Sequence, residues 1–450
     1  WTEKAKLYPD DRGIAGESFG YAVAIDGDRL VVGAPKDSAF APESGAVYVF
    51  ERSSNGGWQQ VAKLYADDYA ANDAFGTSVS VDGNVIAVGA PGATGNSNND
   101  SAYVFEGSGT HWNQVLRRAT YGSDLGRAVA VNSGYVAMGA PDRSGVGEVY
   151  VYQDTASGWL YRATLTASDP ETGEDFGHSL AMDTGRIVVG APYWDGLDST
   201  GDGIGDRPDQ DRVFVFDGSG GNWVREARLT ADGGLPSEDS ANEGRAGDFF
   251  GLSVAADNDY VVVGAPGYDS TALDAGSAYV FYEFDDPGST IGTTWVRSTG
   301  SSGSGRLEAD APAGSDPDAP LADHFGGGVA ISGSRVAVGM PGFNDTDDSS
   351  GTEQIIRADV GAFRTFSTDG MVPTATNANM RAEVLTEGDN ASLFGSITAY
   401  DPASRTLFVG APNDGRVNAY VNEGLYWRPV QELSLLAGPP DDVDARNLSK

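Results

Sequence analysis

The chain has 450 residues, including 62 glycines and no cysteine, and its 65 acidic and 29 basic side chains give a formal net charge of −36. This charge repels phosphate and excludes nucleic acid from the expected partners, and the lack of cysteine excludes disulfides, zinc thiolate sites and thiol catalysis. No apolar run approaches the roughly 18 residues of a membrane span. Two explanations of the acidity stay open: a solvated coat suited to a salty or extracellular medium, and binding of divalent cations, since calcium prefers Asp and Asn oxygens.

The chain contains an internal repeat, in which a Phe-Gly pair is followed by a Gly-Ala-Pro triplet seven times. Pair and triplet are 14 residues apart in the first six copies and 16 apart in the last. Leu125 replaces Phe in the third copy, and Met340 replaces Ala in the sixth. So constant a spacing indicates one repeated structural unit. The pairs begin at Phe19, Phe75, Leu125, Phe176, Phe250, Phe325 and Phe394, and the triplets begin at Gly33, Gly89, Gly139, Gly190, Gly264, Gly339 and Gly410.

Each copy predicts four strands. In the first copy, residues 21–25 follow the Phe-Gly pair with small and β-branched side chains, and the polar turn 26–28 is typical of a hairpin. Residues 30–32 form a continuous apolar run, as expected for a strand buried on both faces. An aromatic-rich third strand covers 46–50, and a fourth begins at Trp58 and ends near Leu64.

A four-stranded antiparallel unit cannot bury both of its faces alone. Seven such units arranged radially bury each sheet between its neighbours. The sequence therefore predicts an all-β fold, a seven-bladed β-propeller of four-stranded antiparallel blades, in one domain spanning 1–450. An open β-solenoid is the alternative, but it requires shorter and more uniform repeats, whereas successive pairs here lie 50 to 75 residues apart.

The Trp-led strand occurs at both ends of the chain, since residues 1–10 and 427–436 are equivalent outer strands and 437–450 form a tail. We expect a terminal Trp-led strand to close the ring by completing the last blade. Only one is needed for this, so the other adds a fifth strand, stays unpaired, or pairs with a neighbouring molecule. The sequence begins at Trp1 without a basic and apolar leader, which indicates a processed or trimmed start.

The repeat resembles the FG-GAP repeat of integrin α-subunit propellers, and more closely the related repeats of bacterial and other microbial surface proteins. The resemblance covers nearly the whole chain and includes the Trp-led strand and the Asp-containing stretches before the pairs, such as 64–68 and 229–232. It implies extracellular binding, adhesion or surface assembly, sometimes as one module of a larger polypeptide. It also implies a secreted or cell-surface location.

The chain departs from that family at the calcium loops. In integrin-like copies, a long Asp-rich loop between the first and second strands holds calcium, whereas the turns here are as short as 131–134 and 331–334. Such turns cannot supply the roughly six oxygen ligands that calcium takes. Even the longer seventh turn, 400–405, has a single carboxylate. The family's calcium sites therefore do not transfer to these turns.

An Asp-rich segment after the fourth triplet is the strongest candidate for a cation site. It resembles the loops of EF-hand-like and thrombospondin type 3 calcium repeats, with Gly203 at the sharp turn. Thr200 stands where Asp or Asn is usual, Asp209 stands where Glu is usual, and no flanking helices are expected. A solvated acidic loop is the alternative. The ligand positions fall on Asp198, Thr200, Asp202, the carbonyl of Ile204, Asp206 and Asp209.

Other acidic or titratable residues give weaker signals. The acidic stretches 344–348 and 269–274 are interpreted as solvated loops, because the first lacks the turn glycine and the carboxylate spacing and the second is weaker still. His111, His178 and His324 have no partner pattern, and nucleophile-elbow and zincin motifs are absent. We therefore expect no enzymatic activity. Glycosylation sequons occur at Asn99, Asn344, Asn390 and Asn447.

In an up-and-down blade, the links from the second to the third strand and from the fourth strand to the next blade share one face. On that face the loops of repeats four to six are long, which favours a binding surface, with drift in tolerant loops as the alternative. Two functions remain. One is a calcium-assisted adhesion module that binds a protein or glycan there; the other is a structural subunit of a surface layer or filament that self-associates through the surplus terminal strand. The long loops are 195–211, 232–248, 310–324 and 343–359.

Overall fold

In the residues that the computed structural model describes, all regular secondary structure is β-strand apart from the one helical turn η1 (Arg143–Gly145). The described residues are 6–7, 17–54, 56–92, 99–168, 173–193, 211–218, 222–231, 248–268, 275–285, 293–297, 306–307, 324–333, 335–341, 345–347, 354–357, 362–367, 385–386, 398–401, 406–411, 416–422 and 427–434.

The first four sheets each contain four antiparallel strands in chain order, as the sequence predicts. Sheet 1 consists of β2 (Ala22–Asp26), β3 (Arg29–Ala34), β4 (Ala46–Arg52) and β5 (Trp58–Leu64). Sheet 2 consists of β6 (Ser78–Asp82), β7 (Val85–Ala90), β8 (Asn99–Ser108) and β9 (His111–Tyr121). Sheet 3 consists of β10 (Val129–Asn132), β11 (Tyr135–Ala140), β12 (Glu148–Gln153) and β13 (Leu160–Leu165). Sheet 4 consists of β14 (Ser179–Asp183), β15 (Arg186–Ala191), β16 (Arg212–Asp217) and β17 (Val224–Leu229).

The remaining sheets follow the same order with additions. Sheet 5 consists of β18 (Ser253–Asp257), β19 (Tyr260–Ala265), β20 (Ser277–Asp285), β21 (Thr293–Arg297) and β22 (Arg306–Leu307). Sheet 6 consists of β23 (Val329–Ser332), β24 (Arg335–Met340), β27 (Ala362–Ser367) and β28 (Leu385–Thr386). Sheet 7 consists of β29 (Thr398–Asp401), β30 (Thr406–Ala411), β31 (Arg416–Asn422), β32 (Trp427–Ser434) and β1 (Lys6–Leu7).

Two details differ from the sequence interpretation. The stretch 344–348, interpreted as a solvated loop, includes β25 (Asp345–Asp347), whose backbone pairs with β26 (Gln354–Arg357) in a separate hairpin. In sheet 5 the outer strand is divided, because β21 and β22 both pair with β20 and are separated by residues 298–305. Leu307 is 3% exposed and occupies the register position that Leu64 holds in sheet 1.

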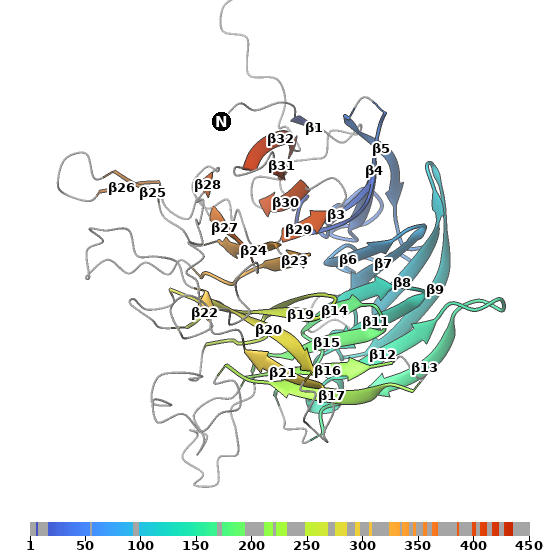
Figure 1. Ribbon diagram of the computed structural model, residues 1–450. Helices are drawn as coiled ribbons and strands as arrows, with labels where there is room; N and C mark the ends of the chain where they lie inside the picture. Colours follow the sequence, from blue (N-terminus) through green and yellow to red (C-terminus); the bar gives the residue numbers. More distant parts are fainter. Residues whose placement is uncertain are drawn as a thin grey trace, which may run out of the picture.

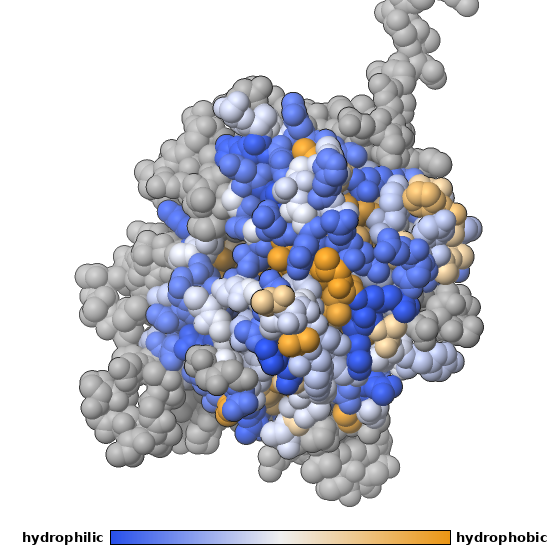
Figure 2. Space-filling view, turned by 90° about the vertical axis from the view of Figure 1, so that its right-hand side faces the viewer, coloured by the Kyte–Doolittle hydropathy of each residue, from blue (hydrophilic) through white to orange (hydrophobic). Residues whose placement is uncertain are grey.

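The burial of each strand follows its side chains. The second strands are buried on both faces, as their apolar runs predict, and Leu30, Val31 and Val32 are fully buried. The first strands range from mostly half-buried, as in β14, to fully buried, as in β23. They lie near the middle of the molecule, while the outer strands β5, β9, β13 and β17 form its rim (Figure 1). Figure 2 shows the side on which β9 and β13 lie, where hydrophilic residues cover most of the surface and hydrophobic residues form small groups. These sheets have the form of propeller blades.

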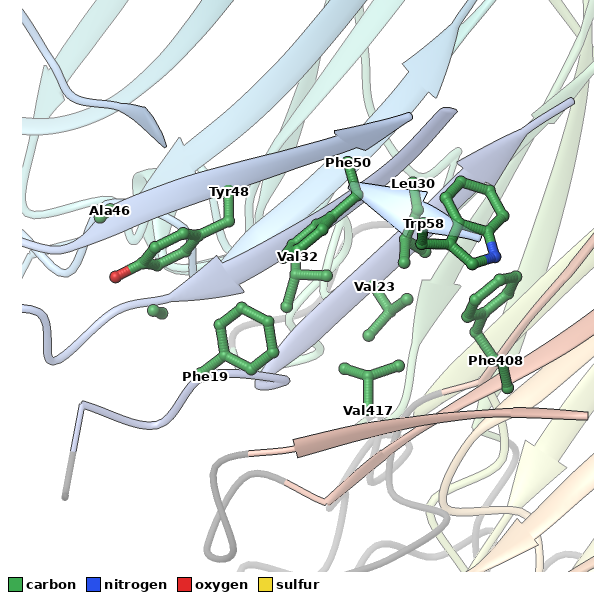
Figure 3. Packing of buried hydrophobic residues seen from close by; sticks show 12 residues of the cluster. Phe19, Val23, Leu30, Val32, Ala46, Tyr48, Phe50, Trp58, Phe408 and Val417 are labelled. Atoms are coloured by element: carbon green, nitrogen blue, oxygen red, sulfur yellow. The ribbon is translucent and has the colours of Figure 1, made fainter. Parts of the chain in front are cut away.

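Neighbouring sheets share apolar cores. The first strand β2 contacts β6 of sheet 2 and β29 of sheet 7, and β29 also contacts β23 of sheet 6. Phe408 and Val417 of sheet 7 pack into the cluster that contains Phe19 and Trp58 of sheet 1 (Figure 3). The first and last sheets of the chain are therefore joined by the same kind of packing that joins sequential sheets.

The tryptophan of the outer strand makes a contact with the preceding sheet. The rings of Trp58 and Phe408 meet edge to face with centroids 5.5 Å apart. The guanidinium of Arg29 lies 4.9 Å from the ring centroid of Trp112. A tryptophan at or near the start of the outer strand thus packs between sheets, which makes this strand recognisable in sequence. The other contacts of this kind are Trp159 with Glu106, Trp223 with Tyr135, and Trp295 with Arg186.

The two terminal strands lie side by side. β32 supplies the fourth strand of sheet 7, and β1 pairs with it in parallel as a fifth strand, with Lys6 opposite Glu432 and Leu7 opposite Leu433. Of the alternatives that the sequence left open for the surplus strand, the structure has the fifth-strand arrangement.

Candidate binding face

The Phe-Gly pair and the Gly-Ala-Pro triplet of a repeat are joined by a backbone hydrogen bond between their glycines. The N–H of Gly76 donates to the carbonyl of Gly89 over 2.9 Å, and Gly76 has a φ of +96°, which favours glycine. This bond aligns the start of the first strand with the end of the second, which explains the constant spacing. The same bond joins Gly20 to Gly33, Gly126 to Gly139, Gly177 to Gly190, Gly251 to Gly264 and Gly326 to Gly339.

The aromatic residue of the pair is a core residue. Phe75 is fully buried and meets the rings of Tyr103 and Phe105 edge to face, with centroids 5.5 and 5.8 Å apart. Leu125, which replaces Phe in the third copy, is also fully buried and packs in the cluster that contains Tyr150. In these repeats the first residue of the pair therefore belongs to the core and anchors the loop that precedes it.

Two kinds of loop meet at the end of the sheets where the Phe-Gly pairs and Gly-Ala-Pro triplets lie. We call this end the FG/GAP face. The loop between β3 and β4 accepts hydrogen bonds from the loop between β5 and β6: Asn72 N–H donates to the Pro42 carbonyl over 2.8 Å, and Ala74 N–H donates to that of Glu43 over 3.1 Å. The N–H of Phe75 makes a third hydrogen bond between the same two loops. The expectation that these two kinds of link share one face is confirmed in these repeats.

Charged residues flank the Phe-Gly pairs of repeats three and four. Asp124 and Asp175 precede the pairs with φ of +55° and +56°, and Arg127 and His178 follow them. Burial raises the pKa of Asp124 to about 6, although Arg127 lowers it, and nearby Asp142 raises it further. Burial also raises the pKa of Asp175 to about 6. This cluster is not among the residues predicted from the sequence; its signal there is the pair of positions on either side of each Phe-Gly.

His178 is uncharged at neutral pH. Burial and the charge of Arg127 lower the pKa of its imidazole to about 3. Its Nδ1 lies 3.9 Å from an oxygen of Asp175, and its ring meets that of Tyr193 edge to face at 5.5 Å. The imidazole therefore packs against its neighbours without forming a charged pair. The other histidines lie elsewhere: Nδ1 of His111 is 3.0 Å from the Thr110 hydroxyl, and His324 precedes a Phe-Gly pair.

Buried carboxylates brace the same face. Asp37 is fully buried, pairs with Lys63 at 2.7 Å and accepts a hydrogen bond from the Tyr48 hydroxyl at 3.1 Å. Asp100 accepts from the backbone N–H groups of Ser123 and Asp124, at 2.6 and 3.0 Å. These acids hold the loops in place and are occupied by protein donors.

The short turns at the opposite end use their aspartates to join sheets. A carboxylate oxygen of Asp26 accepts the N–H of Gly83 in the next sheet over 2.7 Å, and one of Asp82 accepts the N–H of Ser133 over 2.6 Å. These aspartates lie at the short turns between the first and second strands, and they bind backbone donors of the next sheet. The same bond joins Asp183 to Asn258 and Asp257 to Gly333.

A polar pocket of about 340 Å³ lies between sheets 1 and 2 at this opposite end. Arg29 crosses it, with its guanidinium over Trp112 and 2.8 Å from Glu51. Arg29 and Glu51 thus form an ion pair within sheet 1, and the Arg29 guanidinium also donates to Oδ1 of Asn84 in sheet 2 over 3.2 Å. The pocket is lined by Asp26, Asp28, Arg29, Glu51, Arg52, Gly83 and Asn84.

The predicted calcium ligands Asp198, Thr200, Asp202, Ile204, Asp206 and Asp209 lie outside the described residues. So do most residues of the four long loops. Within the described part of the chain, no group of three or more acidic, histidine or cysteine side chains is arranged to hold a metal ion. The calcium site stays a prediction. No helix in the described residues is long and apolar enough to cross a membrane.

Comparison with known proteins identifies the repeat. The family model of the FG-GAP repeat matches residues 1–50, 58–105, 159–205 and 240–281. A crystal structure of a protein from Lactobacillus plantarum is similar in fold, with a TM-score of 0.51 and 13% sequence identity, over 90% of this chain and 95% of that one. No curated protein matches the sequence.

Proposed function

Because the chain belongs to the FG-GAP repeat proteins, we propose that it is a non-enzymatic binding or adhesion module of the secreted or cell-surface compartment. The ligand, a protein or a glycan, binds the loops of the FG/GAP face. One observation carries the proposal: backbone bonds between the 36–45 and 65–75 loops hold the two kinds of link together at one end of the sheets, and in the sequence these are the kinds of link that are longest in repeats four to six.

The scaffold of this proposal is a closed ring of seven blades. The support is the contact of β29 with both β23 and β2, together with the packing of Trp58 on Phe408. Closure in this form joins the N-terminal and C-terminal blades through side chains, and the pairing of β1 with β32 adds a second link.

Binding at the loops tests the function. Replacing the loops 195–211 and 232–248 by links as short as 142–145 should abolish ligand binding. The measurement is capture of ligand from the protein's native surroundings on the immobilised protein, with the intact protein as reference. The buried Asp211 and Asp248 at the ends of the two loops are kept, because Asp211 accepts the N–H of Phe250, and unfolding in urea provides the control for folding. Ligand capture that survives both replacements at unchanged affinity would contradict the proposal.

We also propose that calcium assists ligand binding and that residues within 198–209 hold the ion. The support is the chemistry of the donor set, since carboxylate and carbonyl oxygens suit calcium. Calorimetric titration of the intact protein and of an Asp202→Ala, Asp206→Ala variant should show one site fewer in the variant. An unchanged stoichiometry would remove the assignment.

A second function rests on the terminal strands. β1 pairs with β32 at the outer edge of sheet 7, and an edge strand of this kind can be supplied by a neighbouring molecule. The chain would then be a structural subunit of a surface layer or filament. Deleting residues 1–10 separates the two functions: a binding module keeps its ligand affinity, whereas a strand-exchanging assembly dissociates in light scattering or electron microscopy.

A further inference from the structure

An exposed cluster of aromatic rings lies on the FG/GAP face of the first two repeats. Phe40 is 55% exposed and Tyr69 is 44% exposed, although both are large apolar rings. The two rings stack with centroids 4.9 Å apart and 30° between their planes, and Phe40 meets Tyr65 edge to face at 4.5 Å. We call Phe40, Tyr65 and Tyr69 the aromatic cluster.

The aromatic cluster is held by rigid backbone. Phe40 belongs to the loop whose carbonyls at Pro42 and Glu43 accept hydrogen bonds from the loop that carries Tyr69. Ala70, next to Tyr69, donates its N–H to Asp73 over 2.5 Å. The rings are therefore presented in a fixed arrangement, which lowers the entropy lost when a partner binds.

The surroundings of the aromatic cluster are acidic. The two loops carry five acidic residues and one basic residue. Asp37 and Asp68 already pair with Lys63 and Arg117, at 2.7 and 2.8 Å, but Glu43 and Asp67 are exposed. The π faces of aromatic rings attract cations, and adjacent carboxylates strengthen that attraction.

The inner side of the cluster already binds a cation in this way. The ammonium of Lys63 lies 5.5 Å from the ring centroid of Tyr65 and 4.7 Å from that of Tyr48, and it pairs with Asp37. A lysine from outside would meet the same ring chemistry at Phe40 and Tyr69, in loops that also carry the exposed Glu43 and Asp67. A second copy of the chain is a poor occupant of this particular site, because the chain has 29 basic residues against 65 acidic ones and therefore offers few cationic segments.

We propose that the aromatic cluster binds a lysine- or arginine-rich segment of a partner protein, by cation–π contacts to Phe40 and Tyr69 and by charge attraction to Glu43 and Asp67. This inference rests on the proposed binding function and adds a partner class and a second position, away from the long loops of repeats four to six.

The test must separate this site from general attraction to an acidic protein. A Lys-Gly repeat peptide and a matched peptide with Gln in place of Lys are titrated calorimetrically into the full chain. Three variants of unchanged net charge are compared: Phe40→Ala with Tyr69→Ala, Tyr69→Phe, and a control, Tyr121→Ala with Tyr161→Ala, which removes two exposed rings outside the cluster.

The Lys peptide should bind the intact chain, the Tyr69→Phe variant and the control alike, and the Gln peptide should not bind. The Phe40→Ala, Tyr69→Ala variant should bind the Lys peptide roughly five- to twenty-fold more weakly, from two exposed cation–π contacts. Equal affinity in this variant and the control overturns the inference, since attraction is then diffuse. Binding of a neutral oligosaccharide that depends on Phe40 and Tyr69, without Lys-peptide binding, also overturns it.

Failure of the inference and failure of the proposed function are distinguishable. If ligand capture depends on the long loops but the Lys-peptide affinity does not depend on Phe40 and Tyr69, only the aromatic site is disproved. If Lys-peptide binding depends on those rings but the loop replacements leave ligand capture unchanged, only the proposed role of the long loops is disproved.

Discussion

The carbonyl oxygen of Gly76 lies so close to Gly33 that a Cβ atom on residue 33 would overlap it. Gly33 belongs to the triplet of the first repeat and Gly76 to the Phe-Gly pair of the second, so the contact joins neighbouring sheets through backbone alone. Because Gly76 also donates to Gly89 within its own repeat, each junction is linked to the next. Equivalent approaches occur at Gly89, Gly139, Gly190 and Gly264.

Gly33→Ala should therefore destabilise the protein by about 2 kcal/mol or more, because the added methyl group meets a backbone carbonyl that cannot rotate away. The free energy of unfolding in urea measures the loss. Gly27→Asn is the control: residue 27 has a φ of +55°, which Asn tolerates, and open space around it. A loss no larger for Gly33→Ala than for Gly27→Asn would contradict the close approach.

Asp82→Ala should lower the free energy of unfolding by about 1 kcal/mol, because the N–H of Ser133 in the next sheet loses its carboxylate acceptor. Asp82→Asn should lose less, since its amide oxygen can still accept. Asp154→Ala, at an exposed position after β12, removes the same charge and serves as the control. Equal losses at Asp82 and Asp154 would show that the bond between the sheets adds nothing.

The junction of the first and last sheets can be measured with Trp58 and Phe408. Trp58→Ala should destabilise the protein by about 3 kcal/mol, as for a buried aromatic residue. In a double-mutant cycle with Phe408→Ala, the coupling energy should be about 1 kcal/mol, the usual range for an edge-to-face pair. Additive losses would mean that the two rings do not meet, and the proposed ring closure would lose its main support.

The pKa of Asp124, raised to about 6, predicts a pH dependence. A carboxyl whose pKa is higher in the folded chain than in the unfolded chain contributes stability that is fully present below about pH 4 and is lost as the pH rises through about 6. Asp124→Asn removes this effect while keeping a side chain that tolerates the positive φ. The variant should equal the original protein at pH 4 and exceed it by about 1 kcal/mol at pH 8 in urea unfolding. A difference that is the same at both pH values would exclude the titration of Asp124 as its cause.

The repeat spacing was sufficient to predict the strands, because local chemistry fixes them. The apolar run at 30–32, the hairpin turn at 26–28 and the Trp58 start all lie within a residue or two of the observed strand features. Contacts between repeats were not predictable in this way. That Asp82 binds Ser133, or that Trp58 meets Phe408 from the far end of the chain, depends on how blades are placed side by side.

The candidate sites also differ in whether the sequence alone could reveal them. The sequence drew attention to Asp202 and Asp206 because clustered carboxylates are visible in one dimension. It did not draw attention to Phe40 and Tyr69, since isolated aromatic residues in loops carry no pattern and only their stacking distinguishes them. Likewise, the altered pKa of Asp124 comes from burial and from neighbours in other segments.

The division of one outer strand into β21 and β22 has a use in protein engineering. Both pieces keep their pairing with β20, and Leu307 regains its core position after an insertion. The rim of a blade thus accepts extra polypeptide without loss of register on either side. The segment after Arg297 is a natural point at which to graft a reporter or an affinity tag, leaving both terminal strands untouched.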